Sequence, residues 1–191
     1  MHRELSYILI LTGVIVVMYG FYIPAKAMAS QWLIQDAWSK SKLSGEQIKP
    51  WSWMDSRPVM RLSSVEHNKK LVVLSGDSGN VLAFAPGHNT ASYLPGQGGT
   101  VLVSAHRDTH FSFLQKIDIG NRFIAELPYD DKSHMYEVKD IKVINYQVQD
   151  IEISDIDSEL KLVSCDPFNA TESGGSLRYV VTANLVLNQK D

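Results

Sequence analysis

Three residues with complementary chemistry stand at the ends of apolar segments that are far apart in the chain. Cys165, the only cysteine among 191 residues, ends the apolar run Leu160–Ser164. His106 directly follows a second apolar run, Thr100–Ala105, and Arg178 begins a third. Taken singly, these are a small core thiol, a surface histidine and a solvated strand end. The three together are more informative than any one of them.

Thiol, imidazole and guanidinium are the groups needed for acyl transfer through a thioester. A thiol is a poor nucleophile until it is deprotonated, since its reference pKa is ~8.5. A nearby imidazole can take that proton and later deliver it to a leaving amine. Attack on an amide carbonyl places negative charge on oxygen, which an always-charged guanidinium can stabilise. The sequence leaves open whether the neutral or the charged thiol–imidazole pair dominates at rest.

The elements that would position these groups are short. From Pro58 onward, apolar runs alternate with Gly, Asn, Asp and Pro, and one short helix is expected near Phe111–Ile117. Many short strands separated by turns predict a closed barrel or a sandwich. Because strand ends converge on one rim of a barrel, such a fold would bring the three groups together. The expected strands are Val59–Val65, Lys70–Leu74, Val81–Phe84, Thr100–Ala105, Arg122–Leu127, Met135–Tyr146, Leu160–Cys165 and Arg178–Val186.

The N-terminal segment predicts a membrane anchor over residues 1–24. Leu5–Ile23 holds no charged residue and no proline, and at ~1.5 Å per residue it nearly crosses a ~30 Å hydrocarbon layer. The alternative is a cleaved signal peptide, since Ala25–Ala27 and Ala27–Ala29 resemble small-residue cleavage sites. The apolar run exceeds the usual ~7–15 residue core of a signal peptide, which favours the anchor.

The flanks of this segment bear on its orientation. Arg3 precedes it and Lys26 follows it, so charge determines the orientation only weakly. The short segment ahead of the anchor favours placing the rest of the chain outside the cytoplasm. In an oxidising compartment a single cysteine cannot form an internal disulfide, and Cys165 is therefore flagged as a reactive thiol.

Residues 25–57 are expected to form a juxtamembrane amphipathic helix followed by a linker. Ala25–Leu43 carries apolar residues at helical spacing, and Ser44-Gly45 would stop it. Such a helix would lie near the membrane surface or pack against the next domain. Glu46–Asp55, with Pro50, reads as the linker.

The overall composition excludes some functions. The hydrophobic fraction of 45% allows a sizeable core, and the net charge is only −3. Lys and Arg are scattered, so no nucleic-acid partner is expected. The acidic stretch Asp150–Asp157 is interpreted as a solvated turn rather than a calcium loop. We expect no cofactor and no metal.

The chain from about Pro58 onward resembles the sortases, cysteine transpeptidases held at the cell surface by an N-terminal anchor. Leu94–Phe111 is similar to the strand that leads to the family's histidine, and Val81–His88 is similar to the segment before it. Lys161–Cys165 resembles the Thr-Leu-x-Thr-Cys signature, and Leu177–Val181 carries the arginine. The likeness is greatest to Gram-negative, proteobacterial sortases.

This resemblance implies a mainly β fold, a closed eight-stranded sortase barrel over residues 58–191. It implies that Cys165 is the nucleophile, that His106 is the general acid and base, and that Arg178 positions substrate and stabilises the oxyanion. Ser164 stands where threonine is usual and keeps a hydroxyl, so it is assigned to substrate binding. Ala105 stands where glycine is common, which is a small change.

The implied partners are a secreted protein with a C-terminal sorting signal and an amine acceptor of the cell envelope. The implied location is the inner membrane, with a single span and the catalytic domain in the periplasm. The rival readings are a cysteine peptidase in which water resolves the thioester, and a non-catalytic membrane-anchored binding module. The L,D-transpeptidases are a further rival, but they hold histidine and cysteine closer in sequence than His106 and Cys165 lie here.

Overall fold

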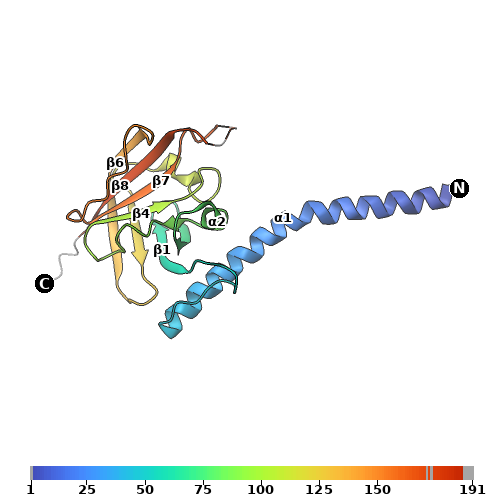
Figure 1. Ribbon diagram of the computed structural model, residues 1–191, viewed down its shortest axis with the longest axis horizontal. Helices are drawn as coiled ribbons and strands as arrows, with labels where there is room; N and C mark the ends of the chain where they lie inside the picture. Colours follow the sequence, from blue (N-terminus) through green and yellow to red (C-terminus); the bar gives the residue numbers. More distant parts are fainter. Residues whose placement is uncertain (1, 171, 173, 187–191) are drawn as a thin grey trace.

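The computed structural model shows a β-barrel attached to one long helix, α1 (His2–Ser44) (Figure 1). It describes residues 2–170, 172 and 174–186. The elements after α1 are β1 (Pro58–Ser64), β2 (Lys69–Ser75), α2 (Gly79–Leu82), β3 (Gly87–His88), β4 (Thr100–Ser104), the 3-10 helix η1 (Ser112–Lys116), β5 (Arg122–Glu126), β6 (Ser133–Asn145), β7 (Glu159–Cys165) and β8 (Leu177–Leu185).

The eight strands close into a barrel in the order β1-β2-β3-β4-β7-β8-β6-β5. The pairs β2–β3 and β4–β7 are parallel, and the other neighbouring pairs are antiparallel. Closure leaves no free sheet edge, which removes a common route to aggregation. The expectation of a closed eight-stranded barrel is confirmed.

Alternation along the strands separates an inner core from an outer face. In β7, Leu160 and Leu162 belong to the large cluster that fills the barrel. Val163, between them and the end of the strand, belongs instead to a smaller cluster on the outside of the sheet. Because successive side chains in a strand point to opposite faces, Cys165 shares the outer face with Val163.

The outer cluster lies where β4, β6, β7 and β8 run side by side. Ile151, from the connection 146–158, packs onto it from outside. β6 and β7 both run antiparallel to β8, which lies between them, so they run in the same direction. The connection must therefore return from the end of β6 to the start of β7 at the other end of the sheet. It therefore crosses the outer face of the sheet. The members of the cluster are Leu102, Ile144, Val163 and Val180.

Two expected elements differ from the structure. The segment Val81–Phe84, expected as a strand, contains part of the short helix α2. Val81 and Ala85 are four residues apart and both pack into one apolar cluster beside α1, which suits helical rather than extended spacing. The parallel strand partner of β2 is instead β3, only two residues long.

The long strand β6 and the short helix η1 agree well with expectation. The segment expected as a strand at Met135–Tyr146 lies almost wholly in the single strand β6 (Ser133–Asn145), whose register against β8 shifts between Val138 and Asp140. A local irregularity of this kind bends a long strand so that it can pair with different neighbours at each end. β6 accordingly pairs with β5 near its start and with β8 over most of its length.

The segment expected as an anchor and the segment expected as a juxtamembrane helix form a single element, α1, not two. α1 runs through Pro24, where the sequence had suggested that the anchor ends. The polarity of the chain changes near this point, but both flanking segments favour helix, and the loss of one backbone donor at proline does not stop it. α1 is long and apolar enough to cross a membrane, and its described side chains from Arg3 to Ala29 are exposed.

The C-terminal part of α1 packs against the barrel rather than lying free. Ile34 and Trp38 are 1% and 2% exposed and join β2 and α2 in one apolar cluster. The guanidinium of Arg61, on β1, lies 5.4 Å from the centroid of the Trp38 ring. The amide nitrogen of Gln31 also donates to the Phe84 carbonyl, at 2.5 Å. This docking fixes the barrel to the end of the helix, as Figure 1 shows.

Candidate active site

The strand order places the three candidate residues next to one another at one rim of the barrel. β7 lies between β4 and β8. In the parallel pair β4–β7, Ser104 is opposite Val163, and the Ala105 amide donates to the Val163 carbonyl at 3.1 Å. His106 therefore follows β4 at the level where Cys165 ends β7.

The antiparallel pair β7–β8 supplies the third residue. Cys165 and Arg178 are direct partners in this ladder. Directly opposed residues in an antiparallel pair project from the same face of the sheet. Cys165 thus stands in the middle, with the strand of His106 on one side and Arg178 on the other.

All three side chains can be reached from solvent. His106 is exposed, whereas Cys165 and Arg178 are half-buried. The Asp166-Pro167 peptide that follows Cys165 is cis. A half-buried thiol on the outer face meets the requirement of a nucleophile that must contact a peptide, which a thiol in the barrel core would not.

The guanidinium of Arg178 is held by three neighbours. Its Nη1 donates to the carbonyl of Gly175 at 2.6 Å and to the carbonyl of Leu177 at 2.8 Å. Its Cζ lies 4.2 Å from the centroid of the Tyr146 ring. A guanidinium over an aromatic face at this distance makes a cation–π interaction.

Ser164 occupies a different place from the one expected of a substrate-binding residue. It is 2% exposed, and its Oγ donates to the Ala105 carbonyl at 3.0 Å. Alternation along β7 turns this side chain away from the outer face that carries Cys165. The hydroxyl thereby ties the end of β7 to the residue before His106, and burial keeps it from contact with a peptide on the outer face.

Arg107 is a residue of the site that sequence reasoning did not single out. Its Nη2 donates to the Ala170 carbonyl at 3.0 Å and to the Glu172 carbonyl at 2.6 Å. These carbonyls belong to the connection between Cys165 and Arg178. The side chain next to His106 therefore links the β4 end to the loop that joins the other two candidates. Its position directly after His106 was the only signal for this role in the sequence.

His110 lies close to His106 and is half-buried. Burial lowers the pKa of His110, and the charge of His106 lowers it further, whereas a hydrogen bond to the Phe84 carbonyl and the charge of Asp108 raise it. The net direction of the pKa shift is downward, which favours the neutral imidazole of His110. A neutral second imidazole avoids charge repulsion with an imidazolium at His106.

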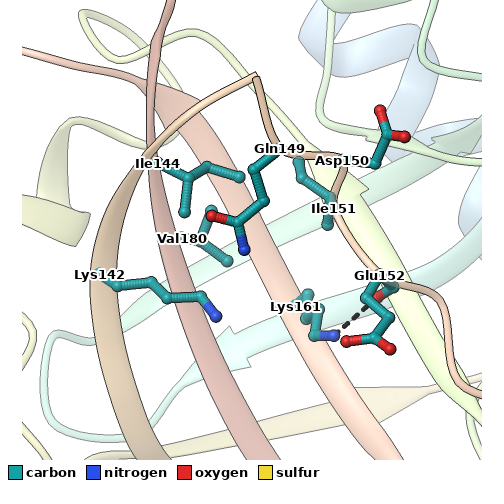
Figure 2. Close-up of a pocket in the computed structure, with 8 residues that line it drawn as sticks. All are labelled: Lys142, Ile144, Gln149, Asp150, Ile151, Glu152, Lys161 and Val180. Carbon is teal, nitrogen blue, oxygen red and sulfur yellow. Dashed lines mark hydrogen bonds between the residues drawn. The ribbon is translucent and has the colours of Figure 1, made fainter. Parts of the chain in front are cut away.

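A cavity of about 320 Å³ opens on the same outer face, toward the far ends of the strands (Figure 2). Its floor contains Ile144 and Val180, and the crossing segment supplies its roof. Lys161 donates from Nζ to the Glu152 carbonyl at 2.7 Å, which pins this roof to β7. Figure 2 shows the ammonium of Lys142 and the amide of Gln149 among the lining side chains together with Ile144 and Val180, so the lining combines apolar and polar groups.

Comparison with known proteins gives a consistent picture. A family model described as "Sortase domain" matches residues 63–186, a range that includes all three candidates. The chain is 27% identical over 115 residues to sortase D of Bacillus subtilis, and the match covers 60% of this chain. That match spans 57% of the length of the Bacillus protein.

Solved structures of similar fold come from several bacteria. Sortase C1 of Streptococcus agalactiae superposes with a TM-score of 0.58 at 26% identity, covering 67% of each chain. A sortase D5 transpeptidase of Clostridium perfringens gives a TM-score of 0.61 at 18% identity, covering 82% of this chain and 96% of that one. At 18% identity the second likeness concerns the fold alone.

Proposed function

The chain belongs to the sortase family, and we propose that it is a membrane-anchored cysteine transpeptidase that cleaves a C-terminal sorting signal and transfers the acyl group to an amine. Sortases are cysteine transpeptidases, and this chain has a cysteine within the matched domain. The observation that carries the proposal is the placement of Cys165 between the end of β4, where His106 follows, and Arg178 on β8.

In the proposed first step, the imidazole of His106 accepts the thiol proton and the sulfur of Cys165 attacks the scissile carbonyl carbon. The C=O π electrons move to oxygen, and the guanidinium of Arg178 stabilises the resulting oxyanion. When the tetrahedral species collapses, the C–N bond breaks and the imidazolium gives its proton to the leaving amine. The product is a thioester on Cys165.

In the second step the same groups act in the reverse order. An acceptor amine attacks the thioester carbonyl and passes its proton to His106. The C–S bond breaks, a new amide forms, and the thiolate recovers the proton from the imidazolium. Cys165, His106 and Arg178 supply every group that both steps need, because acyl transfer is neither an oxidation nor a reduction.

The membrane placement is part of the proposal. α1 supplies one apolar span, and we place the barrel on the periplasmic side of the inner membrane of a Gram-negative cell. Support comes from the apolar, exposed N-terminal part of α1, which is long enough to span a membrane. The relatives reported above come from Bacillus, Streptococcus and Clostridium.

An experiment with the full-length chain in detergent micelles separates transferase from peptidase. Candidate C-terminal peptides are incubated with and without hydroxylamine, an amine that converts a thioester to a hydroxamate. We expect hydroxamate product and a faster release of the leaving peptide when hydroxylamine is present. Release that is unchanged by the amine, with only the free acid formed, would favour the peptidase reading.

A labelling experiment separates the enzyme from a non-catalytic binding module. The rate of alkylation of Cys165 by a small haloacetamide is measured with and without the peptide that is cleaved. The proposal expects alkylation that the peptide suppresses. A thiol that stays unmodified over hours, or one that the peptide does not protect, would support the binding module.

A further inference from the structure

Arg178 is held in a specific arrangement that involves a residue with no role in the steps above. The Cζ atom of Arg178 lies 4.2 Å from the centroid of the Tyr146 ring. Its Nη1 also donates hydrogen bonds to two backbone carbonyls. Arginine has a long side chain with many rotamers, and a cation that must meet a developing oxyanion gains from being fixed beforehand. The ring and the carbonyls together supply this restraint.

Tyr146 is itself anchored on both sides. Its amide donates to the Ser176 carbonyl at 3.1 Å, which joins it to the chain just before β8. The connection that it begins packs onto the outer face through Ile151, as Figure 2 shows. Farther along, the Thr100 amide donates to the Ser154 carbonyl at 2.8 Å, which fixes the connection to the start of β4.

The strand order decides from which side the ring approaches. β8 lies between β6 and β7, so Tyr146, directly after β6, reaches Arg178 from the side opposite Cys165. The Tyr146 ring therefore contacts the guanidinium of Arg178 on the side away from the thiol of Cys165. A guanidinium without this support would be free to move toward β6 and away from the reacting carbonyl.

We propose that Tyr146 is a positioning residue that holds the guanidinium of Arg178 in register with Cys165 for stabilisation of the oxyanion. This inference rests on the proposed function. The part of the side chain that acts is the aromatic face, so the phenol hydroxyl is dispensable. The alternative is that Tyr146, which is 44% exposed, is only a surface ring beside a charged residue.

The test compares steady-state acyl transfer to hydroxylamine by the full-length chain carrying Tyr146→Leu, Tyr146→Phe or Tyr129→Leu. Tyr129 is 46% exposed and lies outside the site, so it controls for the loss of a surface ring. We expect Tyr146→Leu to lower kcat by roughly 3- to 30-fold with little change in KM, the range of a cation–π contact converted to rate. Tyr146→Phe recovers most of this loss.

A double-mutant cycle separates positioning from a general structural role. In the Arg178→Ala background, Tyr146→Leu is expected to have no further effect on kcat, because there is no cation left to position. An equal fold loss in both backgrounds, wild-type kcat for Tyr146→Leu, or an equal loss for Tyr129→Leu would each overturn the inference. Thermal unfolding of each variant identifies a loss due to misfolding, and Tyr146→Phe then decides whether the ring acts on rate.

The two proposals can fail separately. If Arg178→Ala lowers transfer but Tyr146→Leu does not, the positioning inference fails and the transpeptidase proposal stands. If Arg178→Ala leaves transfer unchanged, the oxyanion role of the arginine fails, and the positioning inference fails with it.

Discussion

The two ends of the β7–β8 ladder use charged and polar residues in opposite ways. At the far end, the carboxylate of Glu159 is 7% exposed and is engaged in ion pairs and a hydrogen bond. It lies 2.7 Å from the Lys161 ammonium and 3.5 Å from that of Lys139, and it accepts from Thr100 Oγ1 at 2.9 Å. At the rim, Cys165 and Arg178 face outward and are half-buried.

The difference shows how one pair of strands can serve stability at one end and chemistry at the other. Burial opposes the charge on Glu159, but the hydrogen bonds from Lys161 and Thr100 and the nearby lysine charges outweigh it and hold the pKa of this carboxyl below its usual range. The Glu159 carboxylate, with its hydrogen bonds and ion pairs, stabilises the fold. At the rim the thiol stands on the outer face, where a peptide can reach it. Substitutions at the two ends should therefore separate activity from stability.

The largest effect is expected from Cys165→Ala. Acyl transfer to hydroxylamine should fall below detection, because no other group in the proposed site can form the thioester. The free energy of unfolding should change little, since the side chain is small and half-buried. Transfer rates and thermal unfolding of the same preparation check this. Retained transfer would end the proposed mechanism.

His106→Ala should be nearly as damaging. Removal of a general acid–base group typically costs on the order of 100- to 10,000-fold in rate. His134→Ala is the matched control, because His134 lies near the start of β6, away from the rim. We expect this control to stay within a few-fold of wild type in kcat/KM. Equal losses in the two variants would show that histidine loss acts through folding and not through chemistry.

Arg178→Ala should lower kcat/KM by on the order of 100- to 1,000-fold, the usual cost of removing one oxyanion donor. Arg178→Lys keeps the charge but not the planar fork, so it should recover only part of the loss. Steady-state kinetics with the cleaved peptide measures both. Full activity in the alanine variant would remove the arginine from the mechanism.

Glu159→Gln should have the smallest effect on rate and the largest on stability. Loss of hydrogen bonds to a charged group should reduce the free energy of unfolding by about 1–3 kcal/mol near neutral pH. The same substitution at the exposed Glu137 is the control and should be within about 0.5 kcal/mol of wild type. Denaturant unfolding measures both, and equal shifts would show that Glu159 has no special role.

The pH dependence of this effect follows from the direction of the pKa shift. A carboxyl whose pKa is lower in the folded state stabilises the protein above its unfolded pKa, and this contribution is lost as the pH falls through the folded value. The difference in the free energy of unfolding between wild type and Glu159→Gln should therefore be largest near pH 7 and should vanish below about pH 4. A gap that widens in acid would contradict the assigned shift.

Much of the barrel could be predicted from sequence, because strand ends coincide with changes in polarity. His106, Cys165 and Arg178 could be singled out as candidates because each stands at or beside such an end. The same alternation could have placed Ser164 inside, since Leu162 points into the core and Ser164 lies two residues on. The spacing of Ser164 from Leu162 was therefore enough to predict that Ser164 does not contact a peptide on the outer face.

Other features depend on tertiary structure and could not be predicted. The stacking of Tyr146 on Arg178 requires β6 to neighbour β8, and nothing in the sequence specifies that strand order. The helical form of the segment around Val81 reflects its packing beside α1, which overrides a local pattern that suits a strand. The continuity of α1 through Pro24 is likewise decided by the elements on both sides.

The most direct test is mass spectrometry of the full-length chain after rapid acid quenching with a cleaved C-terminal peptide. The account predicts a mass increase equal to the N-terminal fragment of the peptide, located on Cys165 and removed by hydroxylamine. A cleaved peptide with unmodified Cys165 at every time point, or an adduct on another residue, would contradict a thioester at this rim.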